Sequence, residues 1–150
     1  MPAAALVIRP VAAADFAQWL PLWTEHNTFY KRVLADEITQ ATWKRFFDPA
    51  EPVHALVAED NGQLLGLVHY LFHRATAMIE YNCYLADLFT NAAARGKGVG
   101  QALIEAVYEK GRLAGCSRVY WQTHETNAVA QVLYNKVAER SGFIVYRKQI

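Results

Sequence analysis

The stretch Arg95-Gly96-Lys97-Gly98-Val99-Gly100 decides the fold. It follows a run typical of a strand, Cys83 to Thr90, and opens a helix-like run. Without β-carbons at 96, 98 and 100, the backbone can take positive φ and approach a ligand closely. The unpaired amides of the helix's first turn, and the positive end of its dipole, then point at one spot. Because Arg95 and Lys97 add positive charge there, the stretch predicts a phosphate-binding loop.

The spacing of this loop separates it from two other phosphate-binding loops. In a G-x-G-x-x-G fingerprint, the last glycine would fall on Gln101 or Leu103, depending on the starting glycine. A P-loop needs Ser or Thr after Gly-Lys, whereas Gly98 follows Lys97. The residues alone leave open a glycine-rich turn that only begins a helix. The remaining pattern, Arg-x-x-Gly-x-Gly at 95, 98 and 100, resembles the acyl-CoA pyrophosphate loop of the GNAT superfamily of N-acetyltransferases.

Composition predicts one soluble, cytoplasmic domain over residues 1–150. The chain is 53% hydrophobic, which is ample for a core, and its net charge of +1 favours neither nucleic acid nor an anionic membrane as a partner. Cys83 and Cys116 form no disulfide framework, and no Cys/His spacing predicts a metal site. Met1 to Val11 lacks the features of a signal peptide, and no apolar run is long enough to span a bilayer.

Periodicity predicts an α/β fold with a mixed central sheet and helices on both faces. We expect Pro21 to kink or divide the first helix, and 60–63 to form a hairpin turn. The order after residue 78 implies a crossover between two parallel strands. Strands are expected at 5–9, 54–59, 64–73, 78–90, 118–123 and 143–147, and helices at 13–31, 39–47, 99–114 and 127–138.

A second motif extends the resemblance. Asn127, Ala130, Leu133 and Tyr134 follow the strand at 118–123 and resemble the N-x-x-A-x-x-L-Y segment of the same superfamily. Asn127 and Tyr134 are seven residues apart in the sequence, so they share a helical face. Other short segments resemble the branch that contains the yeast histone and polyamine acetyltransferases. The resemblance implies a single-domain GNAT fold, with two parallel strands that splay apart at the acyl-CoA site.

The resemblance also implies the donor and its binding residues. The expected reaction is direct transfer of acetyl from acetyl-CoA to a primary amine (a small amine, a polyamine, an amino acid or a lysine side chain) in a ternary complex without metal. The alternative is a non-catalytic acyl-CoA-binding module. The residues implied to bind acyl-CoA are Leu88, Phe89, Thr90, Arg95, Gly96, Lys97, Gly98, Val99, Gly100, Asn127 and Tyr134.

The chemistry calls for an acid and a base. Tyr134 is the assigned acid for the departing thiolate, although a tyrosine on an apolar helical stripe can equally belong to the core. An amine of pKa about 10.4 is mostly protonated at pH 7, and freeing its lone pair costs about 4.6 kcal/mol. Asp87 interrupts an apolar strand and is the leading candidate to orient or deprotonate that amine; a structural salt bridge is the alternative. Glu80, His124 or a water chain are further candidates for the base.

The acceptor is the least determined partner. Trp23 and Tyr30 are candidates for an aromatic wall that binds an alkyl-ammonium group, or else for the core, and His26 is a candidate for the acceptor entrance. Ala86 stands where the otherwise similar diamine acetyltransferases have an acidic residue, which weakens a polyamine assignment. The apolar segment from Phe143, together with the resemblance, suggests a homodimer.

Overall fold

The computed structural model describes residues 6–150. Ala5, the expected start of the first strand, lies outside the described residues. Five strands and four α-helices are found there, together with two short 3-10 helices. In chain order they are β1 (Val7–Pro10), η1 (Ala13–Asp15), α1 (Phe16–Phe29), α2 (Asp36–Arg45), β2 (Val53–Asp60), β3 (Gln63–His73), β4 (Asn82–Thr90), η2 (Ala92–Ala94), α3 (Val99–Leu113), β5 (Arg118–Tyr120) and α4 (Ala128–Val137).

The strands form one sheet in the order β1-β2-β3-β4-β5. The first four are antiparallel to their neighbours, and β4 and β5 run parallel. The expected turn joins β2 to β3, with positive φ at both Asn61 and Gly62, as a two-residue hairpin turn with right-handed strand twist requires. The parallel pair ends at Tyr84 and Tyr120, yet β4 continues to Thr90. The predicted mixed sheet is therefore confirmed, and an opening lies between β4 and the chain that follows β5.

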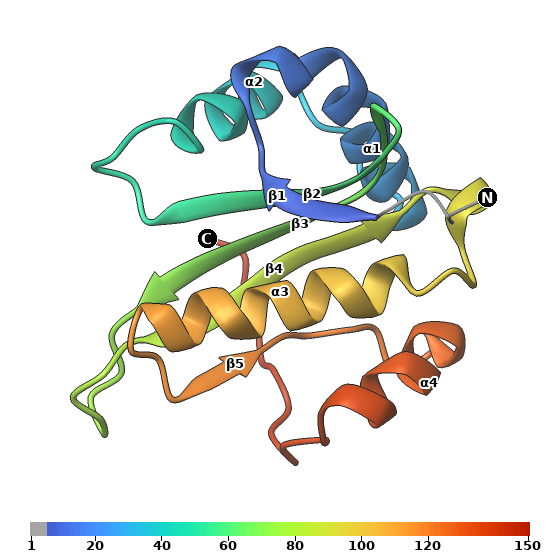
Figure 1. The fold of residues 1–150 in the computed structure, drawn as a ribbon. Coiled ribbons are helices and arrows are strands. Elements are labelled where there is room, and N and C mark those ends of the chain that lie inside the picture. The colour runs from blue at the N-terminus through green and yellow to red at the C-terminus, as the bar shows by residue number, and fades with distance from the viewer. Residues whose placement is uncertain (1–5) are drawn as a thin grey trace.

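Helices cover both faces of the sheet, as expected (Figure 1). On one face, α1 and α2 pack through a cluster centred on Trp19, whose ring lies 5.7 Å from Trp23 and 4.9 Å from Trp43. On the other face, α3 buries Leu103 and Ile104 against the strands. The hydrophobic cluster on this second face also includes side chains of α4. The two helices predicted to bind acyl-CoA, α3 and α4, therefore share one core.

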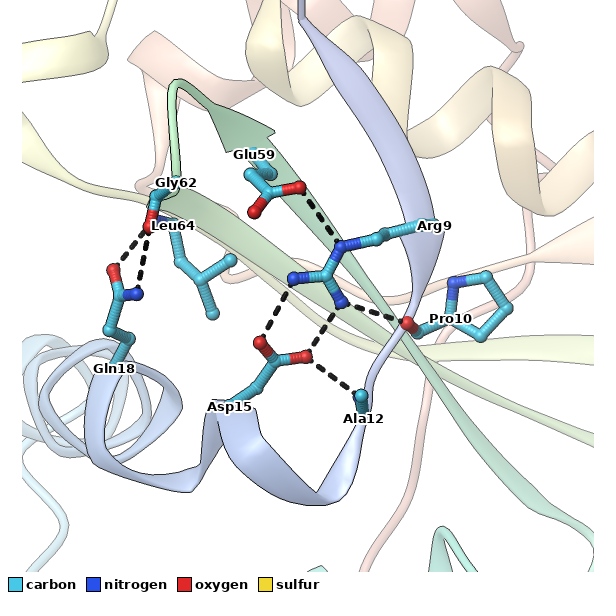
Figure 2. Close-up of polar contacts among 8 residues, drawn as sticks. All are labelled: Arg9, Pro10, Ala12, Asp15, Gln18, Glu59, Gly62 and Leu64. Atoms are coloured by element: carbon cyan, nitrogen blue, oxygen red, sulfur yellow. Dashed lines mark hydrogen bonds and ion pairs between the residues drawn. The ribbon is translucent and has the colours of Figure 1, made fainter.

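Buried and half-buried polar contacts fix the start of α1 (Figure 2). Arg9 on β1 donates to both carboxylate oxygens of Asp15 at 2.7 and 2.9 Å, and to Glu59 on β2 at 3.1 Å. One turn into the helix, the Gln18 side chain accepts from the Leu64 amide at 2.9 Å and donates to the carbonyl of the β2–β3 turn. These contacts hold α1 against the sheet and thereby position the residues on its last two turns.

Two expectations about helices differ from the structure. Pro21 does not divide α1, which runs unbroken from Phe16 to Phe29; both Pro21 and Ala17, whose carbonyl loses its amide partner, are exposed residues. The second helix begins at Asp36 rather than at Thr39, since Asp36 and Glu37 in its first turn favour the positive end of the helix dipole.

The expected strand at 143–147 is not formed. Every residue from 138 to 150 is exposed, with Phe143 at 89% and Tyr146 at 90% exposure. A β-prone sequence needs a neighbouring strand for its backbone hydrogen bonds, and within the described part of the chain this segment has none. The strand expected at 118–123 also stops early, at Tyr120, where its pairing with β4 ends.

Candidate active site

The glycine loop ends in a set of amides without acceptors. Gly96 and Gly98 have φ of +79° and +80°, and Gly98 directly precedes α3. In the described chain, the N–H groups of residues 96–101 have no hydrogen-bond acceptor; the first that does is Ala102, which donates to the Gly98 carbonyl at 3.0 Å. The two left-handed glycines turn these amides toward one side. The geometry suits an anion such as a pyrophosphate.

Gly100 serves a different purpose from the one expected of it. Its φ is not positive. A β-carbon there would lie 3.3 Å from the Leu133 side chain and 3.7 Å from the Thr90 hydroxyl. Its small size therefore lets the start of α3 approach α4 closely, which brings the loop beside the helix that carries Tyr134.

Positive charge surrounds the loop, whereas the end of β4 contributes mainly backbone. Arg95 and Lys97 are exposed, and the Arg95 guanidinium lies 5.9 Å from the centre of the Phe89 ring. Phe89 is buried on the face covered by α1, and Leu88 packs against the α3 face. Because these two side chains are packed in the clusters, residues 88–90 present mainly their peptide groups toward the strand opening.

A β-bulge turns Asp87 toward α1. His69 on β3 lies opposite Asp87, but the next residue, Tyr70, lies opposite Leu85, so Ala86 is an extra residue in β4. With regular alternation, Asp87 would share the α3 face with Cys83 and Leu85. The extra residue shifts it to the other face, where the side chains of α1 lie.

Two histidines hold the Asp87 carboxylate, and a tryptophan holds one of them. His26 on α1 donates from Nε2 to Oδ1 at 3.1 Å, and His69 donates from Nδ1 to Oδ2 at 3.0 Å. The indole N–H of Trp19 donates to Nε2 of His69 at 3.1 Å. Since an indole can only donate, this Nε2 carries no proton, and His69 is the neutral tautomer protonated on Nδ1. Both oxygens of Asp87 thus accept a hydrogen bond.

These contacts set the protonation of Asp87. Burial alone would raise its pKa, because a desolvated carboxylate prefers to be neutral. The hydrogen bonds from His26 and His69 outweigh burial and hold the pKa of Asp87 well below its usual range. Asp87 is therefore ionised and a weak base. Its side chain is 17% exposed, so this charge is accessible at the site.

Tyr134 lies on α4 beside Trp121, with ring centres 5.4 Å apart in an edge-to-face arrangement. Burial raises the pKa of the Tyr134 hydroxyl to about 12, with a further contribution from Tyr30. The hydroxyl therefore keeps its proton at neutral pH. Tyr30 is also in electrostatic reach of Asp87: burial raises the pKa of Tyr30, the Arg32 charge lowers it and the Asp87 charge raises it. The two predicted catalytic residues are thus both within electrostatic reach of Tyr30.

Asn127 caps the start of α4 rather than lying within it. Its side chain donates to the Thr123 hydroxyl at 3.2 Å, and its carbonyl accepts from the Gln131 amide at 3.2 Å. The Asn127 side chain makes no capping hydrogen bond to the amides of α4.

The two aromatic candidates separate. Trp23 is buried, with 7% exposure; it stacks 5.8 Å from His26 and donates to the Thr39 hydroxyl at 3.2 Å. The structure therefore places Trp23 in the core behind His26, which is the alternative that the sequence left open for it. Tyr30, by contrast, is 38% exposed at the end of α1, with its ring 5.1 Å from His26.

Glu80 and His124 lie apart from Asp87. Glu80 precedes β4, at the end of the strand opposite the loop. Its own backbone amide and Ser117 lower the pKa of its carboxyl. His124 is exposed after β5, and its Nδ1 is used in a local turn with Thr126 at 2.7 Å. Cys83 is fully buried, and burial raises the pKa of its thiol to about 12, which excludes it as a nucleophile.

Sequence reasoning missed His69. A histidine in an otherwise apolar strand was the available signal, but its partners, Trp19 and Asp87, are distant in sequence. Among residues 6–150, no group of three His, Cys, Asp or Glu side chains could hold a metal ion. The helices in that range are all too short or too polar to cross a bilayer.

The sheet opens beside a glycine loop, and an ionised carboxylate and a protonated tyrosine lie nearby. This arrangement defines an α/β protein that binds a phosphate-bearing acyl donor. Comparison with known proteins names the class. The chain belongs to the Acetyltransferase (GNAT) family, whose model matches residues 16–138.

Similar proteins agree with this family. The chain is 36% identical over 145 residues to the D-amino-acid N-acetyltransferase HPA3 of Saccharomyces cerevisiae, covering 95% of this chain and 90% of the relative. It is 29% identical over 141 residues to the uncharacterized N-acetyltransferase YhfO of Bacillus subtilis, covering 93% and 94%. The aminoglycoside N-acetyltransferase AAC(6')-Iy in complex with CoA has the same fold, with a TM-score of 0.85 at 17% identity over 99% of this chain and 97% of that one.

Proposed function

We propose that the chain is an acetyl-CoA-dependent N-acetyltransferase that moves acetyl directly to a primary amine in a ternary complex. The observation that carries the proposal is the row of free amides at 96–101, beside the opening between β4 and the chain after β5. The thioester donor supplies an activated acetyl group whose leaving group is a thiolate. The residues around the opening supply binding, orientation and proton transfer.

The donor's pyrophosphate fits the amides that follow Gly96 and Gly98, with Arg95 and Lys97 as counter-charges. The peptide groups of residues 88–90 and the side-chain oxygen of Asn127 would hold the arm that carries the thioester. Binding through backbone groups suits this strand, because Leu88 and Phe89 already use their side chains in the two cores.

Tyr134 would donate a proton to the departing thiolate. A pKa of about 12, set by burial, means that the hydroxyl is protonated at neutral pH and available as an acid. Trp121 packs against its ring and limits its rotation, which holds the hydroxyl in place.

Asp87 would orient the ammonium group of the acceptor. Its carboxylate is ionised and partly exposed, and Tyr30 beside it offers an aromatic face for a cation. Because its pKa lies below the usual range and both oxygens accept hydrogen bonds, Asp87 suits attraction and orientation better than proton removal.

Support for a small primary amine as acceptor comes from the names of similar proteins, which act on D-amino acids and on aminoglycosides. Because the sequence identity to HPA3 spans nearly the whole chain, we place amino acids first among the candidate acceptors. Lysine side chains and polyamines follow. The near-neutral net charge offers no steering toward basic protein tails.

The test is release of free thiol from acetyl-CoA over a panel of D- and L-amino acids, polyamines and lysine peptides. We expect amine-dependent release with at least one small amine. Tight CoA binding without release for any amine would favour the alternative, a non-catalytic acyl-CoA-binding module. Tyr134→Phe serves as the control, because it should bind CoA like the wild type and release thiol more slowly.

We also propose a homodimer that forms through residues 143–147. This segment is apolar and exposed, and the outer edge of β5 has no partner strand in the described chain. Sedimentation of the protein and of Phe143→Asp tests this: the wild type should be dimeric and the variant monomeric. Both cysteines are free, which supports a reducing compartment such as the cytoplasm; fractionation would test it.

A further inference from the structure

His73 and Tyr120 form a short hydrogen-bonded chain that links the ends of β3 and β5. His73 ends β3 and Tyr120 ends β5. The ring Nδ1 of His73 lies 2.8 Å from the Arg74 carbonyl, and Nε2 lies 2.6 Å from the Tyr120 hydroxyl. Since a carbonyl can only accept, Nδ1 carries a proton, and in the neutral ring Nε2 accepts from the Tyr120 O–H.

The chain lies where the parallel strands separate. Tyr84 and Tyr120 are the last paired residues of β4 and β5, with ring centres 5.0 Å apart. The bulge at Ala86 places Tyr84 and Asp87 on one face of β4. Burial raises the pKa of Tyr84, and the neighbouring Tyr120, Asp87 and Tyr30 raise it further. These groups therefore surround one region beside the strand opening.

The reaction needs a proton acceptor that the other candidates do not supply. Asp87 has a low pKa and two hydrogen-bond donors on its oxygens. The Glu80 carboxylate is held by its own backbone amide and by Ser117, and His124 is occupied in its turn. An imidazole can take up a proton on a ring nitrogen that accepts a hydrogen bond and later return it to solvent.

We propose that Tyr120 and His73 together take the proton from the acceptor's ammonium group, an inference that rests on the proposed acetyl transfer. The ammonium N–H bond breaks as its proton passes to the Tyr120 oxygen, and the Tyr120 O–H bond breaks as its own proton forms the Nε2–H bond of His73. The amine keeps the electron pair and attacks the thioester carbon. As the C–S bond breaks, the thiolate takes the Tyr134 proton, and the second proton lost by the nitrogen restores the Tyr134 hydroxyl through solvent. The imidazolium then loses its proton to solvent, so the reaction releases one proton in all.

The surroundings of His73 permit this charge. From β5, the Tyr120 hydroxyl contacts its ring, and Arg118 donates to Asn82, the residue of β4 that lies opposite His73. The neighbouring Arg74 directs its guanidinium away, over the Tyr81 ring at 3.9 Å. Of the carboxylates in the described chain, none pairs with His73, so a proton taken up there is not trapped in an ion pair.

The test compares His73→Gln and Tyr120→Phe on two acceptors: the best amine of the panel, and its analogue with a trifluoromethyl group on the carbon that bears the amino group, which is largely unprotonated at neutral pH. With the ordinary amine, kcat/KM should fall at least about tenfold in both variants. With the fluorinated amine it should change less than about threefold, because this amine is already neutral and needs no base to free its lone pair before it attacks. His54→Gln is the matched control, since His54 packs against Tyr70 away from these groups and should leave both rates unchanged.

Equal losses on both acceptors, or no loss on either, would overturn the relay while leaving the acetyltransferase intact. No turnover by the wild type with any amine would overturn the proposed function and the relay with it. Tyr120→Phe keeps the ring and its contact with Tyr84, so it serves as the readout if His73→Gln does not fold.

Discussion

Gly98 and Gly115 provide a matched pair of substitutions at the two ends of α3. Both have a φ of +80°, and a β-carbon added at either meets no atom within 4 Å. Alanine in this left-handed conformation costs about 1–2 kcal/mol at each position. For a chain of this size, that corresponds to a fall in Tm of about 2 to 8 °C in either variant. The two variants should therefore be equally destabilised.

Only Gly98→Ala should weaken CoA binding. Gly98 orients the free amides, whereas Gly115 ends the helix on the far side from the loop. Alanine at position 98 should strain the loop and tilt its amides. A loss of about 1.4 kcal/mol of binding energy raises the Kd for CoA about tenfold. Thermal denaturation and calorimetric titration with CoA measure both quantities. Equal Kd values for the two variants would refute the assignment of the loop as the pyrophosphate site.

Further predictions concern the acid, the N-terminal contacts and the thiol. Tyr134→Phe should lower kcat at least about tenfold, with CoA affinity unchanged; an unaffected kcat would remove Tyr134 from the mechanism. The hydrogen bond from Arg9 lowers the pKa of Asp15 from 3.8, although burial opposes this shift. The pairing of Asp15 with Arg9 therefore stabilises the fold above that pH, and this stabilisation is lost as the pH falls through the folded-state pKa. Asp15→Asn should thus lower the free energy of unfolding by about 2 kcal/mol at pH 7, with a gap to wild type that closes in acid; a gap independent of pH in denaturant titrations would contradict this. Iodoacetamide should leave Cys83 unlabelled in the native protein, because its thiol is fully buried; mass spectrometry of the peptides checks this.

Features that depend on local sequence were predictable. The loop at 95–100 and the turn at 60–63 follow from residues whose backbone preferences are strong, and the structure places positive φ at Gly96, Gly98, Asn61 and Gly62. The parallel strand pair followed from the order of elements, since a helix must cross between them.

Features that depend on distant partners were not predictable. The protonation of Asp87 depends on His26 and His69, which come from α1 and β3, and on a bulge that moves Asp87 to their face. The core position of Trp23 depends on Trp19 and Thr39 packing over its ring. Periodicity shows that a side chain is apolar, but it does not show which face of a bulged strand or crowded helix it occupies.

Mass spectrometry of a mixture of amines incubated with acetyl-CoA and the protein tests the central claim most directly. We predict that at least one small primary amine gains a single acetyl group on nitrogen, with an equal amount of free CoA released and no acetyl group left on the protein. CoA binding with no acetylated amine would contradict acetyl transfer. An acetylated protein that passes its group on would contradict direct transfer in a ternary complex.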